Sequence, residues 1–458
     1  MNHKYLYRWF CAAILILLAT IIFAVFWITF ISENNNTGFL LGLGNIGLAL
    51  LIYLGLFTVI GKWIGVFRIG VDRKAAIMAA IVMDVGIVAF LEVFLSMAIT
   101  NRFRFFGVLL LRYFLMMIVQ SVVLCLLIIP MINAYRKHFP PLKLLEIHGE
   151  YIQSLHMKLD NISYKYHVED FVDYREVSIE KLKERVEKVD AVVISDIPSK
   201  EKNDILKLCV DMDKRVYFIP KISDVICRYS EELNLIDTPL FLVRKVRIST
   251  MEASIKRSFD VIASLLALVI LSPVLLITAI CIKHEDGGPV FFRQKRVTIN
   301  GQRFMILKFR SMIVDAEKDG RPHPAGEKDP RITKVGNVIR ATRIDELPQL
   351  INILRGEMSI VGPRPERWEH VEKYTEEIPE FSFRTKVKGG LTGYAQVYGK
   401  YNTTPLDKLK MDLMYIMDFS VLLDLQIMFE TIKILFRKES TEGFPDERVE
   451  KMNEKRIE

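Results

Sequence analysis

The stretch Arg343–Glu366, RIDELPQLINILRGEMSIVGPRPE, holds the densest set of reactive side chains in this chain. It places an acidic pair, Asp345 and Glu346, one turn after Arg340, and it ends with Arg364 between two prolines. Adjacent carboxylates beside arginines can hold Mg²⁺, attack phosphorus and neutralise phosphate charge. Acidic residues also favour helix N-termini where no reaction occurs. The pair is therefore a candidate for catalysis that needs support from the rest of the sequence.

Four long apolar segments precede this stretch. Of the 458 residues, 51% are hydrophobic, and the mean hydropathy of +0.24 is high for a soluble protein. Each segment reaches the roughly 20 apolar residues that a helix needs to cross a bilayer. The segments are Phe10–Ile31, Phe39–Ile60, Ala75–Thr100 and Phe105–Ile132. We therefore predict a membrane protein with a bundle of four transmembrane helices over residues 1–138, and phosphate chemistry next to the membrane.

The basic residues that flank these segments predict the orientation of the bundle. Cations gather before the first segment, between the second and third, and after the fourth, whereas the first intervening loop, Ser32–Thr37, has none. Loops rich in lysine and arginine tend to stay in the cytoplasm, so this pattern places both termini there. The second external loop, with Arg102 and Arg104, is a mild exception.

Two carboxylates, Asp84 and Glu92, lie inside the third apolar segment. Acidic residues within a membrane are candidates for functional sites by default. The simpler alternative is that they are paired or water-exposed groups between helices. Because no charged partner lies at a similar depth, no transport pathway follows, and a polytopic sugar transporter is a weak interpretation.

Charge and cysteine content argue against other classes of protein. The net charge of +8 suits a surface that lies against anionic lipid. Nucleic-acid binding is not indicated, because the basic residues are interleaved with acidic ones and no recognisable motif appears. The five cysteines include no CxxC pair, so neither a zinc site nor a disulfide framework is expected.

A fifth apolar segment, Phe259–Ile282, is also long enough to cross the bilayer. Cations flank it on both sides, which disfavours placing its ends on opposite faces of the membrane. Ser272 and Pro273 lie in its middle, where proline removes a backbone hydrogen bond and bends a helix. We therefore predict a re-entrant membrane helix over residues 251–284, broken at Ser272-Pro273. An ordinary fifth span with a proline kink is the alternative.

Residues 139–250 have the pattern of alternating strands and helices that is typical of a doubly wound α/β domain. The turn after the first strand lacks the GxGxxG pattern that lets phosphate approach the backbone. We expect a small Rossmann-like cytoplasmic domain with a structural or regulatory role, in preference to a cofactor site. The expected strands are Leu142–Ile147, Ala191–Ser195 and Arg215–Ile219, and the expected helices are Ser178–Val189 and Lys202–Val210.

From Ser254 to Phe436, a series of short motifs resembles the bacterial sugar transferases, also called monotopic phosphoglycosyl transferases. The resemblance is closest to the long subgroup with four N-terminal spans, which primes exopolysaccharide or capsule assembly. The family usually has proline where this chain has Gly389, which leaves the stiffness of that turn open. The matching motifs are Lys256–Asp260, Ser272-Pro273, Gly288–Phe292, Lys308–Met312, Asp329–Thr333, Asp345–Gln349, Met358–Glu366 and Lys388–Gly393.

The resemblance implies an activity. Members of the family move a sugar-1-phosphate from a UDP-sugar to undecaprenyl phosphate, which gives undecaprenyl-diphosphate-sugar and UMP. The reaction would follow a ping-pong course through a covalent aspartyl phosphosugar, with the active site on the cytoplasmic side of the bacterial inner membrane. It would be the first membrane step of exopolysaccharide, capsule or O-antigen assembly. The sequence does not name the sugar.

The resemblance also implies roles for single residues. Asp345 would be the nucleophile and would hold Mg²⁺, and Glu346 would position or assist it and help with proton handling. Arginine's forked guanidinium suits phosphate binding, and we assign four cations to that role. These are Arg340, Arg364, Lys308 and Arg310, while the expected membrane-interface residues are Lys256, Arg257, Asp260, Ser272 and Pro273.

We expect the catalytic domain to be an α/β domain over residues 285–440, followed by a charged tail, 441–458. The spans of the bundle suggest a homodimer. A competing hypothesis is a non-catalytic membrane scaffold or regulator of a polysaccharide assembly complex. Release of UMP from a UDP-sugar distinguishes the enzyme from the scaffold.

Overall fold

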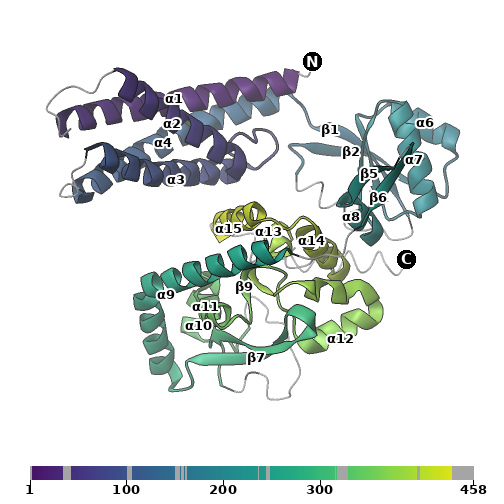
Figure 1. Ribbon diagram of the computed structural model, residues 1–458. Helices are drawn as coiled ribbons and strands as arrows, with labels where there is room; N and C mark the ends of the chain where they lie inside the picture. The colour runs from purple at the N-terminus through teal and green to yellow at the C-terminus, as the bar shows by residue number, and fades with distance from the viewer. Residues whose placement is uncertain are drawn as a thin grey trace. The chain divides into compact units, whose positions relative to one another are not determined.

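A computed structural model describes residues 3–34, 43–100, 106–149, 155, 159, 162–235, 237–243, 248–314, 316, 329–399 and 403–435. The predicted charged tail, 441–458, lies outside these residues. The chain divides into two compact units, residues 1–219 and 220–458, which are described separately below. The fold is mixed, with long apolar helices and several small sheets (Figure 1).

The first unit begins with four long helices, each overlapping one of the predicted apolar segments. Together with α9 of the second unit, they make five helices among the described residues that are long and apolar enough to span a membrane. The four are α1 (His3–Asn34), α2 (Leu43–Ile64), α3 (Lys74–Thr100) and α4 (Phe106–His138).

The helices α1–α4 pack around a shared core of large side chains, which includes Phe23 and Trp27 from α1 and Tyr53 from α2. The Phe23 and Tyr53 rings stack with centroids 4.1 Å apart. Many outward side chains are also apolar and exposed, among them Leu51 and Leu126. An apolar exterior around a packed interior is what a helical bundle needs in lipid.

Asp84 and Glu92 point into this bundle. Both side chains are fully buried, and none of their four carboxylate oxygens has a hydrogen-bond partner among the described residues. Within the described part of the chain they are therefore unpaired and shielded from solvent, unlike the paired or water-exposed groups of the simpler interpretation.

The rest of the first unit contains a four-stranded parallel sheet in the order β2-β1-β3-β4. Its strands and helices agree closely with the predicted ones, except that β2 was not predicted. The core lies between β1, β3 and the helices, with Ile147, Val186 and Val192 buried. The elements are β1 (Leu142–His148), β2 (Tyr166–Asp173), α6 (Ile179–Glu187), β3 (Ala191–Ser195), α7 (Ser199–Asp211) and β4 (Arg215–Phe218).

The second unit starts with α8 (Ile222–Arg228) and the antiparallel hairpin of β5 (Glu231–Leu235) and β6 (Thr238–Leu242). The sequence placed these residues in the Rossmann-like domain, which was expected to end at residue 250. In the structure, Val225 of α8 packs with Phe381 and Leu409 in a core of the second unit.

The hairpin of β7 (Phe291–Val297) and β8 (Arg303–Phe309) opens the α/β part of the second unit. Its turn contains Asn300 and Gly301, both with positive φ, as expected for an Asn-Gly hairpin signal. The remaining elements are α10 (Lys334–Ala341), the 3₁₀ helix η3 (Ile344–Glu346), α11 (Gln349–Arg355), β9 (Ser359–Val361), α12 (Trp368–Glu377), the 3₁₀ segment η4 (Pro379–Lys386), β10 (Gly390–Thr392), α13 (Tyr394–Tyr398), α14 (Pro405–Met417) and α15 (Val421–Leu435).

Helix α9 (Thr250–Asp286) contains Pro273 and forms two limbs that meet at a sharp bend (Figure 1). Its first half packs on the main core of the second unit through Phe259 and Leu268. Its far end packs on the same unit, where Ile282 contacts a cluster with Phe309. Between these contacts lies a run of exposed apolar side chains, which includes Ile262, Leu265, Leu266, Val269, Ile270, Leu276, Ile277 and Ile280.

Candidate active site

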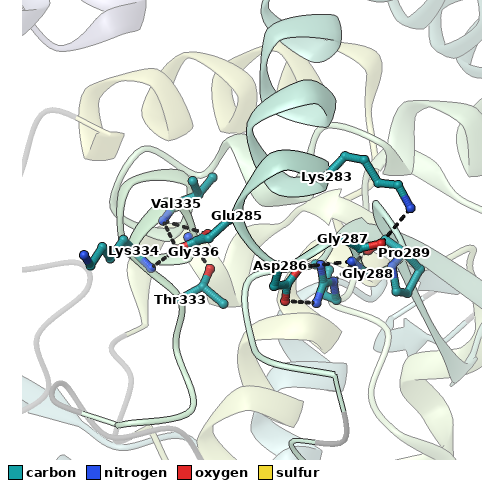
Figure 2. Close-up of polar contacts among 11 residues, drawn as sticks. Lys283, Glu285, Asp286, Gly287, Gly288, Pro289, Thr333, Lys334, Val335 and Gly336 are labelled. Atoms are coloured by element: carbon teal, nitrogen blue, oxygen red, sulfur yellow. Dashed lines mark hydrogen bonds and ion pairs between the residues drawn. The ribbon is translucent and has the colours of Figure 1, made fainter.

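The C-terminal end of α9 holds the start of α10. The Glu285 carboxylate accepts hydrogen bonds from the backbone N–H groups of Lys334, at 2.7 Å, and Val335 (Figure 2). The Thr333 hydroxyl accepts a third from Gly336 N–H, at 2.9 Å. Together these acceptors satisfy free donors at the helix N-terminus, and the carboxylate also complements the helix dipole. The C-terminal end of α9 therefore fixes the position of α10.

A sharp change of direction follows α10 and presents the acidic pair. Arg343 has φ +59°, a left-handed conformation that is uncommon for a residue with a side chain. It ends the helical run that carries Arg340 and starts η3, which contains Asp345 and Glu346. Backbone outliers of this kind often occur at functional sites, where the surrounding structure holds them.

The turn at Gly362–Glu366 carries Arg364 to the same place from the other side. It follows β9, which pairs in parallel with β10. A Cβ on Gly362 would lie 2.4 Å from the Lys388 carbonyl oxygen, so only glycine permits this close approach. The turn is thus packed directly against the segment that carries Gly389.

Gly389 lies where the resemblance noted in the sequence implies a proline. Its backbone N–H donates a hydrogen bond to Thr298 Oγ1 at 3.1 Å. A proline there would have no N–H to donate. In this chain the backbone N–H of Gly389 therefore joins this segment to Thr298.

Glu346 is the centre of a three-residue ion cluster. Its Oε1 accepts a hydrogen bond from Lys308 Nζ at 3.0 Å and from Arg364 Nη2 at 2.8 Å. The side chains of Glu346 and Lys308 are mostly buried, whereas Arg364 is 39% exposed. The structure therefore brings together both predicted acids and two of the four predicted cations.

The pKa values of Asp345 and Glu346 are shifted in opposite directions. Burial raises the pKa of Asp345, and the neighbouring charge of Glu346 raises it further, against the effect of Lys308. Burial would also raise the pKa of Glu346, but Arg364 and Lys308 outweigh it and lower that pKa far below its usual range. Glu346 is consequently ionised at neutral pH, which favours a positioning role for it over a role in proton handling.

Within the described part of the chain, Asp345, unlike Glu346, is not engaged by a cation through a hydrogen bond. Its Oδ1 is buried and has no hydrogen-bond partner among the described residues. The guanidinium of Arg340, on the last turn of α10, makes no hydrogen bond or ion pair with a described residue, and its charge lowers the pKa of Asp345. A buried carboxylate oxygen without a partner among the described residues, close to the charge of Arg340, is suited to a ligand that carries phosphate or a cation.

The residues fit a weakly ligated metal ion. Within the described residues, no group of three or more histidine, cysteine, aspartate or glutamate side chains could hold a metal. Mg²⁺ needs no such cage, because one or two carboxylates together with substrate phosphates and waters suffice. Asp345 can be that carboxylate, whereas Oε1 of Glu346 is already occupied by two cations.

Arg310, the fourth predicted phosphate-binding cation, is not part of this cluster. Its guanidinium is buried, contacts both carboxylate oxygens of Asp286, and donates from Nε to the Pro289 carbonyl at 2.7 Å. Asp286 also accepts from Gly288 N–H at 3.1 Å (Figure 2). In this structure Arg310 ties the end of α9 to β8, and a role in phosphate binding stays a prediction.

The residues predicted to anchor the membrane interface have partners inside the protein. Lys256 donates to the Val361 carbonyl at 2.9 Å and is ion-paired with Asp424. Arg257 donates to two carbonyls at the end of α11. Asp260 accepts from Ile360 N–H, and the Ser272 hydroxyl donates to the Val269 carbonyl within α9, next to Pro273. These contacts fix the first limb of α9, while contact with lipid stays a prediction.

Sequence reasoning missed a group of charged residues behind the Arg364 turn. Arg384 from η4 donates to the Arg364 carbonyl at 2.9 Å and is ion-paired with Asp412 of α14. Glu366, at the end of the turn, lies 3.7 Å from the same guanidinium. No motif contains Arg384 or Asp412, and only the folded arrangement brings them together.

Comparison with known proteins identifies the family. A model described as bacterial sugar transferase matches residues 251–438, which include the whole ion cluster. The chain is 41% identical over 191 residues to the exopolysaccharide production protein ExoY of Sinorhizobium fredii, and the match covers 39% of this chain and 83% of that protein. The chain belongs to the bacterial sugar transferase family. The resemblance seen in the sequence is therefore confirmed.

Two further proteins are similar to this chain. It is 44% identical over 190 residues to the UDP-N-acetylgalactosamine-undecaprenyl-phosphate N-acetylgalactosaminephosphotransferase of Aeromonas hydrophila, which covers 41% of this chain and 45% of that protein. It is 35% identical over 318 residues to the UDP-glucose:undecaprenyl-phosphate glucose-1-phosphate transferase of Klebsiella pneumoniae, which covers 66% of this chain and 64% of that protein. The chain thus spans about half to two thirds of the length of these relatives.

Proposed function

We propose that the chain transfers a sugar-1-phosphate from a UDP-sugar to undecaprenyl phosphate, with release of UMP, as the first membrane step of exopolysaccharide, capsule or O-antigen assembly. The names of the relatives describe this class of reaction. The observation that carries the proposal is the ion cluster, in which Glu346 is neutralised by Lys308 and Arg364 while Asp345 Oδ1 has no partner among the described residues.

Asp345 is the proposed nucleophile. One of its carboxylate oxygens attacks the sugar-linked phosphorus, the bond from that phosphorus to the bridging oxygen breaks, and UMP leaves with the electron pair. A phosphate oxygen of undecaprenyl phosphate then attacks the same phosphorus, and the Asp345 carboxylate is regenerated. Neither step requires a proton shuttle when both attacking oxygens are ionised, which agrees with a Glu346 whose pKa is held low by Arg364 and Lys308. Two successive displacements replace one direct transfer between anions.

The cations around the acids have a proposed electrostatic role. Arg340 and Arg364 lie on opposite sides of Asp345 in the chain and offer forked guanidinium groups to the phosphates of the donor. Lys308 and Arg364 are held in place by Glu346 before a substrate arrives, so little reorganisation accompanies binding. Mg²⁺, when bound at Asp345, would neutralise diphosphate charge and make UMP a better leaving group.

We also propose that α9 enters the membrane and returns to the cytoplasmic side. Its two limbs pack on one unit at both ends, its middle exposes apolar side chains, and Pro273 lies between the limbs. This arrangement would hold Asp345 at headgroup depth, where the phosphate of a lipid acceptor lies, in the bacterial inner membrane with the active site on the cytoplasmic face. Placement of both substrates at one boundary lowers the entropic cost of their encounter. A homodimer stays a prediction.

Cysteine accessibility tests the path of α9. Single cysteines replace Met251, exposed at the start of α9, and Lys295, exposed on β7, in a chain without its native cysteines. We expect a membrane-impermeant maleimide to label both positions only in inverted vesicles, because both ends lie on the cytoplasmic side. A cysteine at Asn35, in the predicted external loop, is the opposite-side control. Labelling of the two positions from opposite faces would show a fifth span instead.

Release of UMP tests the activity itself. Purified full-length protein in lipid nanodiscs is supplied with undecaprenyl phosphate, Mg²⁺ and, in turn, UDP-glucose, UDP-galactose, N-acetylated UDP-sugars and UDP-dideoxy-diamino sugars. We expect one donor to release UMP, EDTA to abolish the release, and added Mg²⁺ to restore it, because diphosphate charge must be neutralised. Protein that releases no UMP from any donor would favour the scaffold hypothesis.

A further inference from the structure

The turn that carries Arg364 is held mainly through its carbonyl groups. Two of its residues, Pro363 and Pro365, have no N–H, so the turn has few donors of its own. Four consecutive carbonyls accept hydrogen bonds from distant parts of the unit. The bonds are Gly390 N to Pro363 O at 2.9 Å, Arg384 Nη2 to Arg364 O at 2.9 Å, Arg296 Nη1 to Pro365 O at 3.2 Å, and Val297 N to Glu366 O at 3.1 Å.

Arg384 contacts Arg364 itself, and several neighbouring groups hold its guanidinium. Its side chain is only 5% exposed, and the same Nη2 that reaches the Arg364 carbonyl lies 2.8 Å from Asp412 Oδ2. The ring of Phe381 lies 4.9 Å from the guanidinium carbon. A buried arginine is rarely retained without a charged partner, because removal of its charge from water is costly. Asp412 supplies that partner.

Asp412 is itself buried, at 1% exposure, and comes from a different element, α14. Burial raises the pKa of Asp412 to about 6, against the opposing effect of Arg384. The neighbouring guanidinium of Arg384 favours the charged form of this carboxyl, as expected for an ion pair. Glu366 lies 3.7 Å from Arg384 Nη1 and adds a second negative charge.

We propose that Arg384, oriented by Asp412, is a positioning residue that holds the Arg364 backbone so that the Arg364 guanidinium meets Glu346 and the donor phosphates. Arg384 is too buried to bind substrate, and it acts through the carbonyl of the residue that does. The inference rests on the proposed function, because it gives Arg384 a part in the transfer of sugar phosphate.

A double-mutant cycle tests this coupling, with UMP release as the measure of kcat/KM. Arg384→Gln, Arg364→Gln and the double variant are compared with the wild-type protein. We expect Arg384→Gln to lower kcat/KM by about 10²-fold, because a shift of about 1 Å in a phosphate-binding group has an effect of that size. In the Arg364→Gln background, the same change should lower it by less than about threefold, since its target is already gone.

Arg303→Gln is the matched control. Arg303 lies on the same unit, is 56% exposed, forms a surface ion pair with Glu372, 3.6 Å away, and lies 4.4 Å from the centre of the Trp368 ring. We expect its kcat/KM to stay within about twofold of wild type, since exposed ion pairs contribute little. Asp412→Asn is the second test variant, and it serves if Arg384→Gln does not fold. It should lower kcat/KM about tenfold in the wild-type background and have little effect beside Arg364→Gln.

The outcomes separate this inference from the proposed function. Wild-type protein that releases no UMP contradicts the proposed function. An active wild type with Arg384→Gln and Asp412→Asn within twofold of it contradicts the inference alone. So does a double variant whose loss equals the product of the single losses, because independent losses indicate a merely structural contribution from Arg384.

Discussion

Replacement of Asp345 by asparagine is expected to abolish transfer, with UMP release slower by about 10⁴-fold or more. The amide keeps the size of the side chain and loses the nucleophilic oxygen and its charge. Asp345 Oδ1 makes no hydrogen bond to a described residue, so the fold loses little from this change. The measurement is the single-turnover rate of UMP release with the preferred donor and Mg²⁺.

The control for this variant is Asp418→Asn, because Asp418 is an exposed aspartate at the end of α14 in the same unit. Its rate should match that of wild type. Transfer by Asp345→Asn within tenfold of wild type would mean that another group attacks phosphorus, and the proposed roles of the two acids would have to be reassigned.

Replacement of Glu346 by glutamine is expected to damage both activity and stability. The change leaves Lys308 and Arg364 without their shared anion, and loss of one partner of a largely buried ion pair costs about 3–5 kcal/mol. Since Arg364 is partly exposed, the lower end of that range is expected. The rate of UMP release should fall by about 10²-fold or more, because both cations lose their fixed positions. Chemical unfolding and UMP release measure the two effects.

The stability effect of Glu346 should depend on pH with a definite sign. Its pKa is lowered in the folded protein, so its charge contributes stability above the ordinary glutamate pKa of about 4.3, and this contribution falls as pH drops below that value. The difference in unfolding free energy between wild type and Glu346→Gln should therefore be largest near pH 7 and smaller at pH 4. Glu372→Gln, at an exposed pair, is the control. An equal difference at both pH values would contradict the ionised state of Glu346.

Local signals in the sequence predicted much of the fold. The Asn300-Gly301 turn was predictable because both residues adopt positive φ, which that dipeptide accepts readily. The lengths of the apolar segments predicted α1–α4 and α9, because the length and composition of a segment can be read from that segment alone. Strand β2 was missed, because it is not a continuous apolar run and most of its residues are partly or fully exposed.

The candidate site was predicted in part. The acidic pair and Arg364 belong to one short stretch, so their proximity could be expected. Lys308 meets Glu346 across 38 residues, and the resemblance to a family, more than spacing, pointed to it. Arg310, which belongs to the same motif as Lys308, was also assigned to phosphate binding, yet Asp286 engages it across 24 residues. Pairings of that kind depend on tertiary packing, which one sequence does not reveal.

The charges behind the site were the hardest to foresee. Arg384 belongs to none of the recognised motifs, and its partner Asp412 belongs to an amphipathic helix in which an acid is ordinary. Their burial, which makes them informative, is a property of the folded unit. Similarly, only the folded structure shows that Lys308 and Arg364 engage Glu346 while Asp345 Oδ1 has no partner among the described residues.

Intact-protein mass spectrometry of the wild-type chain, mixed with Mg²⁺ and its UDP-sugar in the absence of undecaprenyl phosphate, tests the central claim most directly. We predict a mass increase equal to one sugar phosphate, mapped by peptide fragmentation to Asp345 and discharged when the lipid phosphate is added. Rapid transfer of sugar phosphate to the lipid without any such adduct, or an adduct on a different residue, would contradict it.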